Sequence, residues 1–435
     1  MLTRRQVLAL AVATAVPGSA AWGAAAAPAA LRWTDLSPAL QRRLRALGVA
    51  DFDAWATAER ADTVRRVEDG LGEHRVAVAL QSRLWTSDAP IEPALSAREF
   101  IEHRRVPQDA ARRLSSFAEA LAGTDGRLDM LRALRPRGLD RAALRGRLLD
   151  DYARTMRFLY AKEFEARNAD EVARLYQDRG LSTDTGVDGG YAVSEALGTL
   201  PIDRPVGRLL IVGPGLDLGP RTSLHDDTLG QTTQPFAVVD ALRALGRAAP
   251  AVLVDTLDVN PVVGEVIGTL ARANADASLV LRSSLSTRRH RLLPSYLDYL
   301  QTWGRALGAP ASALTPDADG RPTRHVRVPA GAWQRLTPHA GHVALDVAPG
   351  PYDLIVATNV LTYLGEAALV AACGALARAL RPGGFLVHNE PRPAMEAAAV
   401  DAGMPVVQAR SVAFTAPDAS GRVEHDLAGV HRLLS

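Results

Sequence analysis

The sequence predicts an α/β fold, with a doubly wound, mostly parallel sheet in the C-terminal half and an all-α part before it. Three observations lead to this prediction. From residue 205 to 435, short apolar runs alternate with helical segments, as expected of parallel strands that helices cover on both faces. Between residues 31 and 195, apolar residues recur at three- and four-residue spacing, which is typical of helices. A glycine-containing loop, residues 213–219, directly follows the first apolar run.

Length and composition bound what the chain can be. With 435 residues, of which 47% are hydrophobic and 23% charged, it is long enough for two globular units. Its formal net charge of +2 gives no reason to expect a nucleic-acid partner. Cys373 is the only cysteine, which excludes an intramolecular disulfide and a multi-cysteine zinc site. Because it lies in an alanine-rich, helical-looking run, we interpret it as a core residue rather than a nucleophile.

The first 27 residues have the pattern of an export signal. Arg4 and Arg5 precede a mostly apolar run at residues 7–16, and small residues follow. The arginine pair resembles a twin-arginine signal, although Val7 stands where phenylalanine is typical; an ordinary secretory signal is the alternative. We therefore expect an exported, periplasmic protein. Beyond residue 30 there is no run of about 18 apolar residues, so no membrane span is expected.

The helical part, predicted over residues 31–195, contains no catalytic motif. Its clearest helical segments are residues 40–47 and 141–164. We expect its charges to form a solvated face, and its position beside the sheet suggests a lid or a substrate-recognition part. Residues 180–190 are rich in Gly, Ser, Thr and Asp, which predicts a connecting loop. The alternative is a loop that folds over a bound ligand.

The sheet part, predicted over residues 205–435, reads as alternating strands and helices. The expected strands are residues 209–212, 252–258, 353–358 and 385–388, and the expected helices are residues 236–245, 296–307 and 367–380. In such sheets ligands bind beyond the carboxyl ends of the strands, where the strand order reverses. The residues that follow each strand are therefore the candidates for a site.

The first candidates follow the first strand: Gly213, Pro214, Gly215, Asp217 and Gly219. Glycines there allow a tight turn and a close approach of the ligand to the backbone, although Gly-Pro-Gly also makes ordinary turns. Their spacing, G-x-G-x-x-x-G, differs from the G-x-G-x-x-G of dinucleotide-binding loops. A pyrophosphate also needs a helix N-terminus directly after the loop, whereas residues 220–231 intervene here. The pattern favours a ligand without phosphates.

Two further strands end in polar residues. Asp258 ends the second strand, where a carboxylate can accept hydrogen bonds from both hydroxyls of a ribose, and Asn260 follows it. The alternative for both is a helix cap, since Asn260 precedes a proline. Thr358, Asn359 and Tyr363 follow the third clear strand and line the expected ligand crevice. For Asn359 and Tyr363 the alternative is a capping asparagine and a tyrosine at the edge of the core.

The stretches 352–364 and 380–386 resemble class I S-adenosylmethionine-dependent methyltransferases, especially chemotaxis-receptor methyltransferases and their relatives. The likeness spans about residues 205 to 390, and the wider chain, with residues 90–96, resembles exported bacterial methyltransferase-like proteins. The resemblance implies a Rossmann-like fold and S-adenosylmethionine as cofactor. Gly213, Gly215 and Asp217 would face its methionine and ribose portions, Asp258 its ribose, and Asn359 its methyl group. Asp217 replaces the family's third glycine.

The resemblance implies methyl transfer to a small-molecule or protein acceptor that the sequence does not identify. Positioning supplies most of the acceleration in such a reaction, and Asn359 and Tyr363 are the residues expected nearest the reacting atoms. His388 and Glu390, at the end of a late strand, are candidate bases, although for His388 a structural role is the favoured interpretation. One alternative is an exported binding or structural protein that keeps the fold without turnover. A nicotinamide-dependent oxidoreductase is disfavoured by the glycine spacing.

Overall fold

The computed structural model describes residues 27–123, 138–217 and 230–434. The predicted export signal lies, but for its last residue, outside the described residues and stays a prediction, as does the localisation. Gly219 lies outside them as well. No helix among the described residues is long and apolar enough to cross a lipid bilayer.

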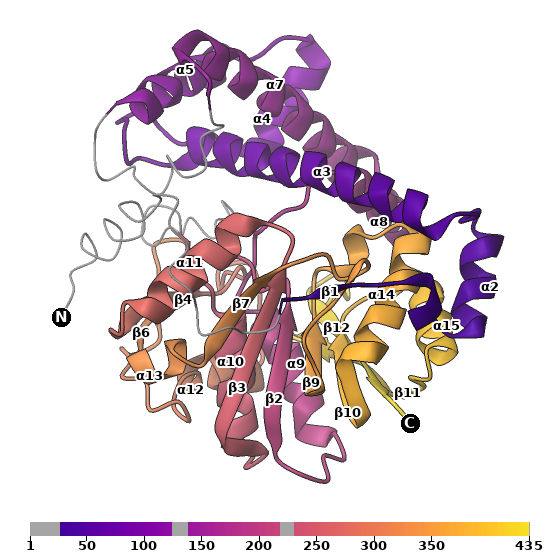
Figure 1. The fold of residues 1–435 in the computed structure, drawn as a ribbon. Coiled ribbons are helices and arrows are strands. Elements are labelled where there is room, and N and C mark those ends of the chain that lie inside the picture. Colours follow the sequence, from indigo (N-terminus) through magenta and orange to yellow (C-terminus); the bar gives the residue numbers. More distant parts are fainter. Residues whose placement is uncertain (1–26, 124–137, 218–229, 435) are drawn as a thin grey trace.

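A seven-stranded sheet forms the centre of the C-terminal half (Figure 1). Its order is β11-β12-β10-β9-β2-β3-β7. Neighbouring strands from β7 to β10 run parallel, and only β12 is antiparallel to its two neighbours. The strands are β2 (Val206–Val212), β3 (Ala248–Asp258), β7 (Leu336–Ala340), β9 (Tyr352–Ala357), β10 (Leu380–His388), β11 (Val406–Ala413) and β12 (His425–Arg432). The chain leaves β2 in both directions across the sheet, so the strand order reverses between β2 and β9. This confirms the predicted Rossmann-like, doubly wound fold of the class I methyltransferase type.

Helices cover both faces of this sheet, as the alternating pattern predicts. Within β2, Leu209 and Ile211 belong to one core and Leu210 and Val212 to the other, because successive side chains point to opposite faces. The helices of the first face are α9 (Gly189–Thr199), α10 (Gln234–Ala244) and α11 (Pro261–Arg272). Those of the second face are α14 (Glu366–Ala379) and α15 (Pro393–Asp401). Cys373 is fully buried in α14, as predicted.

The N-terminal segment adds a layer to the second face. Strand β1 (Ala29–Ala30) pairs with β8 (Asp346–Val347), and α2 (Pro38–Ala46) packs on α14 and α15. Ser37 caps α2 through its hydroxyl and also donates to the carbonyl of Asp401 at 2.7 Å. The first described residues therefore pack on the sheet part, and the helical layer begins with α3.

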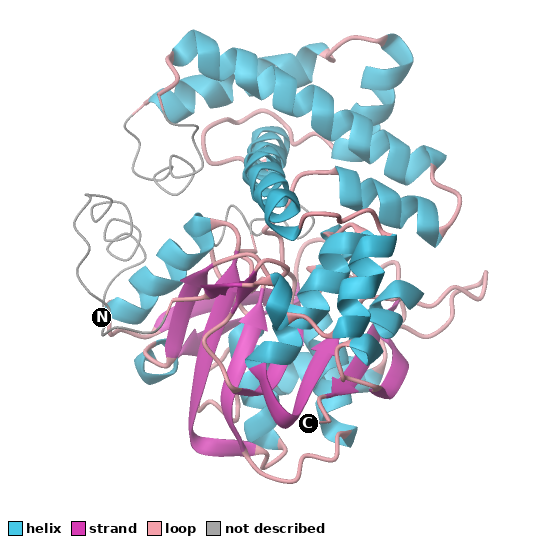
Figure 2. Ribbon diagram, turned by 45° about the vertical axis from the view of Figure 1, so that its right-hand side comes forward, coloured by secondary structure: helices cyan, strands magenta, loops and turns pink. Residues whose placement is uncertain are grey.

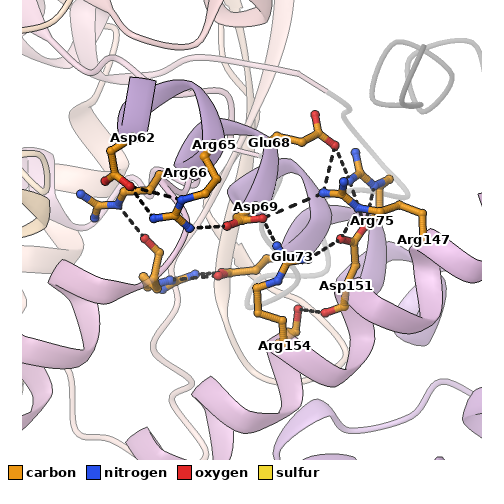
Figure 3. A network of polar contacts seen from close by, with 12 residues as sticks. Asp62, Arg65, Arg66, Glu68, Asp69, Glu73, Arg75, Arg147, Asp151 and Arg154 are labelled. Atoms are coloured by element: carbon orange, nitrogen blue, oxygen red, sulfur yellow. Dashed lines mark hydrogen bonds and ion pairs between the residues drawn. The ribbon is translucent and has the colours of Figure 1, made fainter. Parts of the chain in front are cut away.

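The helical layer lies across one end of the sheet (Figures 1 and 2). Its elements are α3 (Phe52–Gln81), α4 (Pro93–His103), α5 (Gln108–Ala122), α7 (Arg141–Tyr160), the π-helical turn Ala161–Glu165 and α8 (Ala169–Asp178). A charged network ties α3 to α7 (Figure 3). At its centre Asp151, fully buried, accepts hydrogen bonds from Arg75, Arg147 and Arg154. Since a buried charge is tolerated only when it is paired, this network fixes the relative position of the two helices.

An insertion between α11 and β7 was not predicted. It holds a three-stranded sheet, β4-β6-β5, with the bounds β4 (Ala277–Arg282), β5 (Thr315–Pro316) and β6 (Pro322–Val328). It also carries α12 (Pro294–Thr302) and α13 (Ala330–Trp333). The helix predicted over residues 296–307 is therefore shorter and belongs to the insertion. The third strand of the large sheet in chain order is β7, not β9.

Candidate functional site

Two adjoining cavities lie at the carboxyl edge of the large sheet, beneath the helical layer. The smaller has a volume of about 80 Å³ and the larger about 420 Å³. Five residues line both: Ser182, Asp184, Thr185, Asn359 and Tyr363. The first three belong to the connector, residues 180–190, so this segment covers the carboxyl edge. The position of the connector therefore agrees with the alternative interpretation, in which this loop folds over a bound ligand.

The smaller cavity collects residues from the ends of four adjacent parallel strands. Gly213 and Gly215 follow β2, Asp258 ends β3, His342 follows β7 and Thr358 follows β9. Apolar side chains form the remaining walls: Leu181, Val212, Leu257, Val343, Val360 and Leu364. A flat apolar slot with a few polar groups at its edge is the usual form of a nucleoside site.

The glycine loop is shaped by close contacts with other parts of the chain. Gly213 has a φ of +62°, and a Cβ there would lie 2.3 Å from Cγ2 of Val360. Gly215 has a φ of +66°, and its Cβ would lie 2.5 Å from the carbonyl oxygen of Thr183. That carbonyl accepts a hydrogen bond from the backbone N–H of Leu216 at 2.9 Å. Both glycines are therefore required by the protein's own packing, because a side chain at either position meets strain and a clash.

Asp258 has the environment of a carboxylate that waits for hydrogen-bond donors. It is partly buried at the rim of the smaller cavity, and its Oδ1 accepts from the backbone N–H of Asn260 at 2.8 Å. Burial raises the pKa of Asp258 to about 7, although backbone N–H groups of Asn260, Gly215 and Val259 oppose the rise. Among the described residues no cation pairs with it. Donors from a ligand would stabilise its ionised form.

His342 is a cavity residue that the sequence reasoning missed. Its Nδ1 accepts from the backbone N–H of Ala344 at 3.1 Å, so in the neutral ring Nε2 carries the proton. Burial lowers the pKa of His342 to about 4, and the ring therefore stays neutral near pH 7. A neutral imidazole with one N–H donor suits a ring nitrogen or a hydroxyl of a nucleoside.

Asn359 and Tyr363 lie where the two cavities meet. Asn359 has a left-handed backbone, with a φ of +58°. Its N–H donates to Oδ1 of Asn389 at 2.8 Å, and Nδ2 of Asn389 donates back to Oδ1 of Asn359 at 2.8 Å. This pair joins the ends of β9 and β10 and leaves Nδ2 of Asn359 as the donor beside the cavities. The ring of Tyr363 packs edge-on against Tyr176 of α8, with centroids 5.8 Å apart.

Arg66 of α3 links the helical layer to this site (Figure 3). Its guanidinium donates to the carbonyl oxygens of Tyr363 at 3.1 Å, Arg179 at 3.0 Å and Tyr176 at 3.4 Å. It therefore holds the C-terminal end of α8, directly before the connector, and the segment after β9 together. No feature of the sequence distinguishes Arg66 from the neighbouring arginines of α3.

Several predicted site residues lie elsewhere. Asn260 caps α11, its side chain accepting from the N–H of Val262 at 3.1 Å, and it lines neither cavity. Pro214 lines neither cavity, and its carbonyl accepts from the Thr232 hydroxyl at 3.1 Å. Thr358 does line the smaller cavity, and its hydroxyl accepts from the side-chain amide of Gln234 at 2.5 Å. Asp217, expected to face the cofactor's methionine and ribose portions, lines the larger cavity and not the smaller one.

The two candidate bases are structural. His388 and His431 are buried and join through their Nε2 atoms at 3.0 Å. Glu390 is buried and pairs with Arg392 at 2.8 Å. Neither His388 nor Glu390 lines the two cavities, which agrees with the favoured interpretation of His388 as structural. In the described part of the chain no group of three or more His, Cys, Asp or Glu side chains is arranged to hold a metal ion.

The larger cavity has an acidic and aromatic lining. Its four carboxylates are Asp184, Asp188, Asp217 and Asp426, and its three aromatic rings are Tyr176, Tyr363 and Phe414. Asp217 is 3% exposed, and its Oδ2 accepts from Nε2 of Gln231 at 2.8 Å. Burial raises the pKa of Asp217 well above its usual value, and the nearby charge of Asp184 raises it further.

Similarity to known proteins is found among solved structures. No family model matches the sequence, and no curated protein matches it. Among solved structures it is similar to the N-methyltransferase NodS from Bradyrhizobium japonicum WM9, at 14% identity and a TM-score of 0.28, covering 56% of this chain and 94% of that one. A TehB-like SAM-dependent methyltransferase from Corynebacterium glutamicum shares 13% identity at a TM-score of 0.27, covering 56% and 86%. The glycopeptide N-methyltransferase MtfA complexed with (S)-adenosyl-L-methionine shares 13% at 0.30, covering 58% and 96%. At these values the assignment of the fold rests on the strand order.

Proposed function

We propose that the chain is an S-adenosylmethionine-dependent methyltransferase whose cofactor binds at the carboxyl edge of the sheet. One observation carries the proposal: Gly213, Asp258, His342 and Asn359 meet around one cavity at the point where the strand order reverses. That is the ligand position of doubly wound sheets. Because the same fold carries many functions, the support for the proposed cofactor comes from the groups that these residues can bind.

The residues fit the adenosine part of this cofactor. Asp258 offers carboxylate oxygens to the two ribose hydroxyls, and its raised pKa reflects a buried carboxylate without a paired cation. Leu257, Val343 and Val360 provide apolar walls for the adenine ring, with the N–H of His342 beside them. The glycine spacing G-x-G-x-x-x-G, which differs from that of pyrophosphate-binding loops, agrees with a ligand that has no phosphate.

The volumes of the two cavities indicate that bound S-adenosylmethionine would extend from the smaller cavity into the larger one. Ligand pockets typically measure about 300–1,000 Å³. The smaller cavity, at about 80 Å³, holds only part of a nucleoside, whereas the larger, at about 420 Å³, falls in that range. The methionine end of the cofactor is therefore directed towards the larger cavity, past Asn359 and Tyr363. When bound there, the cofactor supplies an electrophilic methyl carbon.

The chain's own residues position the reactants and exclude water. The helical layer and connector cover the carboxyl edge, with Arg66 holding the carbonyls of Arg179 and Tyr363. The reciprocal pair of Asn359 and Asn389 fixes the floor between the cavities. Methyl transfer needs an acceptor held in line with the methyl group, and rigid positioning of this kind supplies much of the rate acceleration.

Calorimetric titration tests the proposal. The full chain should bind both S-adenosylmethionine and S-adenosylhomocysteine, and Asp258→Ala should weaken both by about a hundredfold, the loss of two charge-assisted hydrogen bonds. Asp150→Ala is the matched control, because Asp150 is an exposed carboxylate on α7 that lines neither cavity. Folded protein that binds neither ligand, or equal binding by Asp258→Ala, would exclude the proposed site.

A further inference from the structure

We propose that the larger cavity receives the methyl acceptor as a cationic amine; this inference rests on the proposed function. The larger cavity shares Asn359 and Tyr363 with the smaller one, so a molecule inside it lies next to the cofactor. Its volume of about 420 Å³ suits a small molecule or a single long side chain.

The charge of the lining favours a cation. Four carboxylates line the larger cavity, and the cationic or titratable basic side chains among its described lining residues are Arg179 and His425. Arg179 already forms an ion pair with Glu73, and its guanidinium lies 4.1 Å from the ring centroid of Phe158. Asp188 accepts hydrogen bonds from Tyr296 and Ser284, so it is satisfied within the protein. Neither Asp217 nor Asp426 forms an ion pair with a described residue, so these two carboxylates leave the lining with a negative charge.

Asp217 provides an independent indication of a ligand. Only 3% of the surface of Asp217 is exposed, yet the residue lines the larger cavity. Its Oδ2 accepts from Gln231, whereas no described residue donates a hydrogen bond to Oδ1. An ammonium group in the cavity would supply a donor to this oxygen and the charge opposite to that of the carboxylate. A neutral donor would leave the charge unbalanced, and an anionic ligand would be repelled.

The aromatic residues complete a site for an amine. Tyr176, Tyr363 and Phe414 line the same cavity as the carboxylates. Aromatic faces attract alkylammonium groups and also pack against the apolar body of such a ligand. An ammonium must lose a proton before its nitrogen becomes a nucleophile, and a neighbouring carboxylate oxygen, such as Oδ1 of Asp217, is a suitable acceptor for that proton.

A charge series tests the proposal directly. The full chain, saturated with S-adenosylhomocysteine so that the cofactor's own ammonium is already bound, is titrated with tyramine, 4-ethylphenol and 3-(4-hydroxyphenyl)propanoate. These probes share a phenol and differ in charge. We expect tyramine to bind at least about tenfold more tightly than the other two, the usual effect of one charge-assisted hydrogen bond in a partly buried site. Equal affinities, or preference for the propanoate, would overturn the inference.

Variants assign the preference to named groups. Asp217→Asn should abolish the tenfold preference while S-adenosylhomocysteine still binds, and Asp150→Asn should change neither. Because replacing a buried residue such as Asp217 risks unfolding, Asp426→Asn is the second variant. Asp426 lies on β12 and accepts from Asn389 at 3.3 Å, and its substitution should reduce the preference. A preference that survives both substitutions in folded protein would refute the assignment. Loss of S-adenosylhomocysteine binding in the unmodified chain would instead refute the proposed function, so the two failures are distinguishable.

Discussion

Cofactor affinity should depend on pH through one carboxylate. Asp258 accepts the ribose hydroxyls only when it is ionised, and in the free protein burial raises its pKa to about 7. Near pH 7, Asp258 is therefore protonated in about half of the free protein. In those molecules its carboxyl group must lose the proton before it can accept hydrogen bonds from the ribose hydroxyls. The sign follows from the raised pKa: affinity is highest above pH 7 and falls as pH decreases below it.

The magnitude follows from the protonated fraction. The apparent Kd is the intrinsic Kd multiplied by one plus the ratio of protonated to ionised carboxylate. With a pKa of about 7, this factor is about 1.1 at pH 8 and about 11 at pH 6. We therefore expect Kd to rise about tenfold between these values, which corresponds to about 1.4 kcal/mol.

Calorimetry with S-adenosylhomocysteine from pH 6 to pH 8 measures this slope. Repeating the titration at pH 7 in buffers of different ionisation enthalpy counts the protons released, and about half a proton per ligand is expected. Asp258→Asn should bind more weakly with a flat profile, which separates Asp258 from Asp217 in the neighbouring cavity. A tenfold slope that persists in Asp258→Asn, or a flat profile in the unmodified chain, would refute the reasoning.

Three further predictions concern packing, positioning and stability. Gly213→Ala should destabilise the fold by about 1–3 kcal/mol in urea titrations, because of its left-handed backbone and the clash with Val360; Gly146→Ala, on the exposed face of α7, should instead stabilise slightly. Arg66→Met should lower the free energy of unfolding by about 2–3 kcal/mol and weaken S-adenosylhomocysteine binding. Arg65→Met is the control: Arg65 forms exposed ion pairs, so its loss should change the free energy of unfolding by less than about 1 kcal/mol and leave binding intact. Equal effects of the two substitutions would contradict a positioning role for Arg66. Burial lowers the pKa of His388 to about 3, so the unfolded chain gains a proton first, and the stability that this residue contributes, full above about pH 6.5, should fall by about 2 kcal/mol by pH 5, in addition to the losses from His74 and His342. His388→Leu should flatten that part of the urea-derived profile, and an unchanged slope would count against the neutral histidine pair.

The sequence predicted the parts of the site that depend on strongly apolar strands. Val252–Asp258 and Asp353–Thr358 contain uninterrupted apolar stretches, so the positions of Asp258 and Asn359 at their carboxyl ends followed directly. Asn359 was proposed as a site residue, and the structure places it between the two cavities.

Residues outside that pattern were missed for identifiable reasons. Strand β7 reads Leu-Thr-Pro-His-Ala, with little apolar character, so neither it nor His342 beyond it was recognised. The insertion between α11 and β7 separated two strands that are neighbours in chain order, and α12 was consequently assigned to the main sheet. Asp217 was placed by analogy with a third glycine, but it lines the larger cavity and not the smaller one. The local periodicity of apolar residues does not show which strands become neighbours or which cavity a side chain lines.

A crystal structure of the full chain with S-adenosylhomocysteine tests the central claim most directly. We predict that both ribose hydroxyls lie within hydrogen-bonding distance of the Asp258 carboxylate. The adenine should lie between Val343 and Val360, beside His342. The thioether sulfur should face the larger cavity, past Asn359. A ligand bound elsewhere, or an adenosine that makes no contact with Asp258, would contradict it.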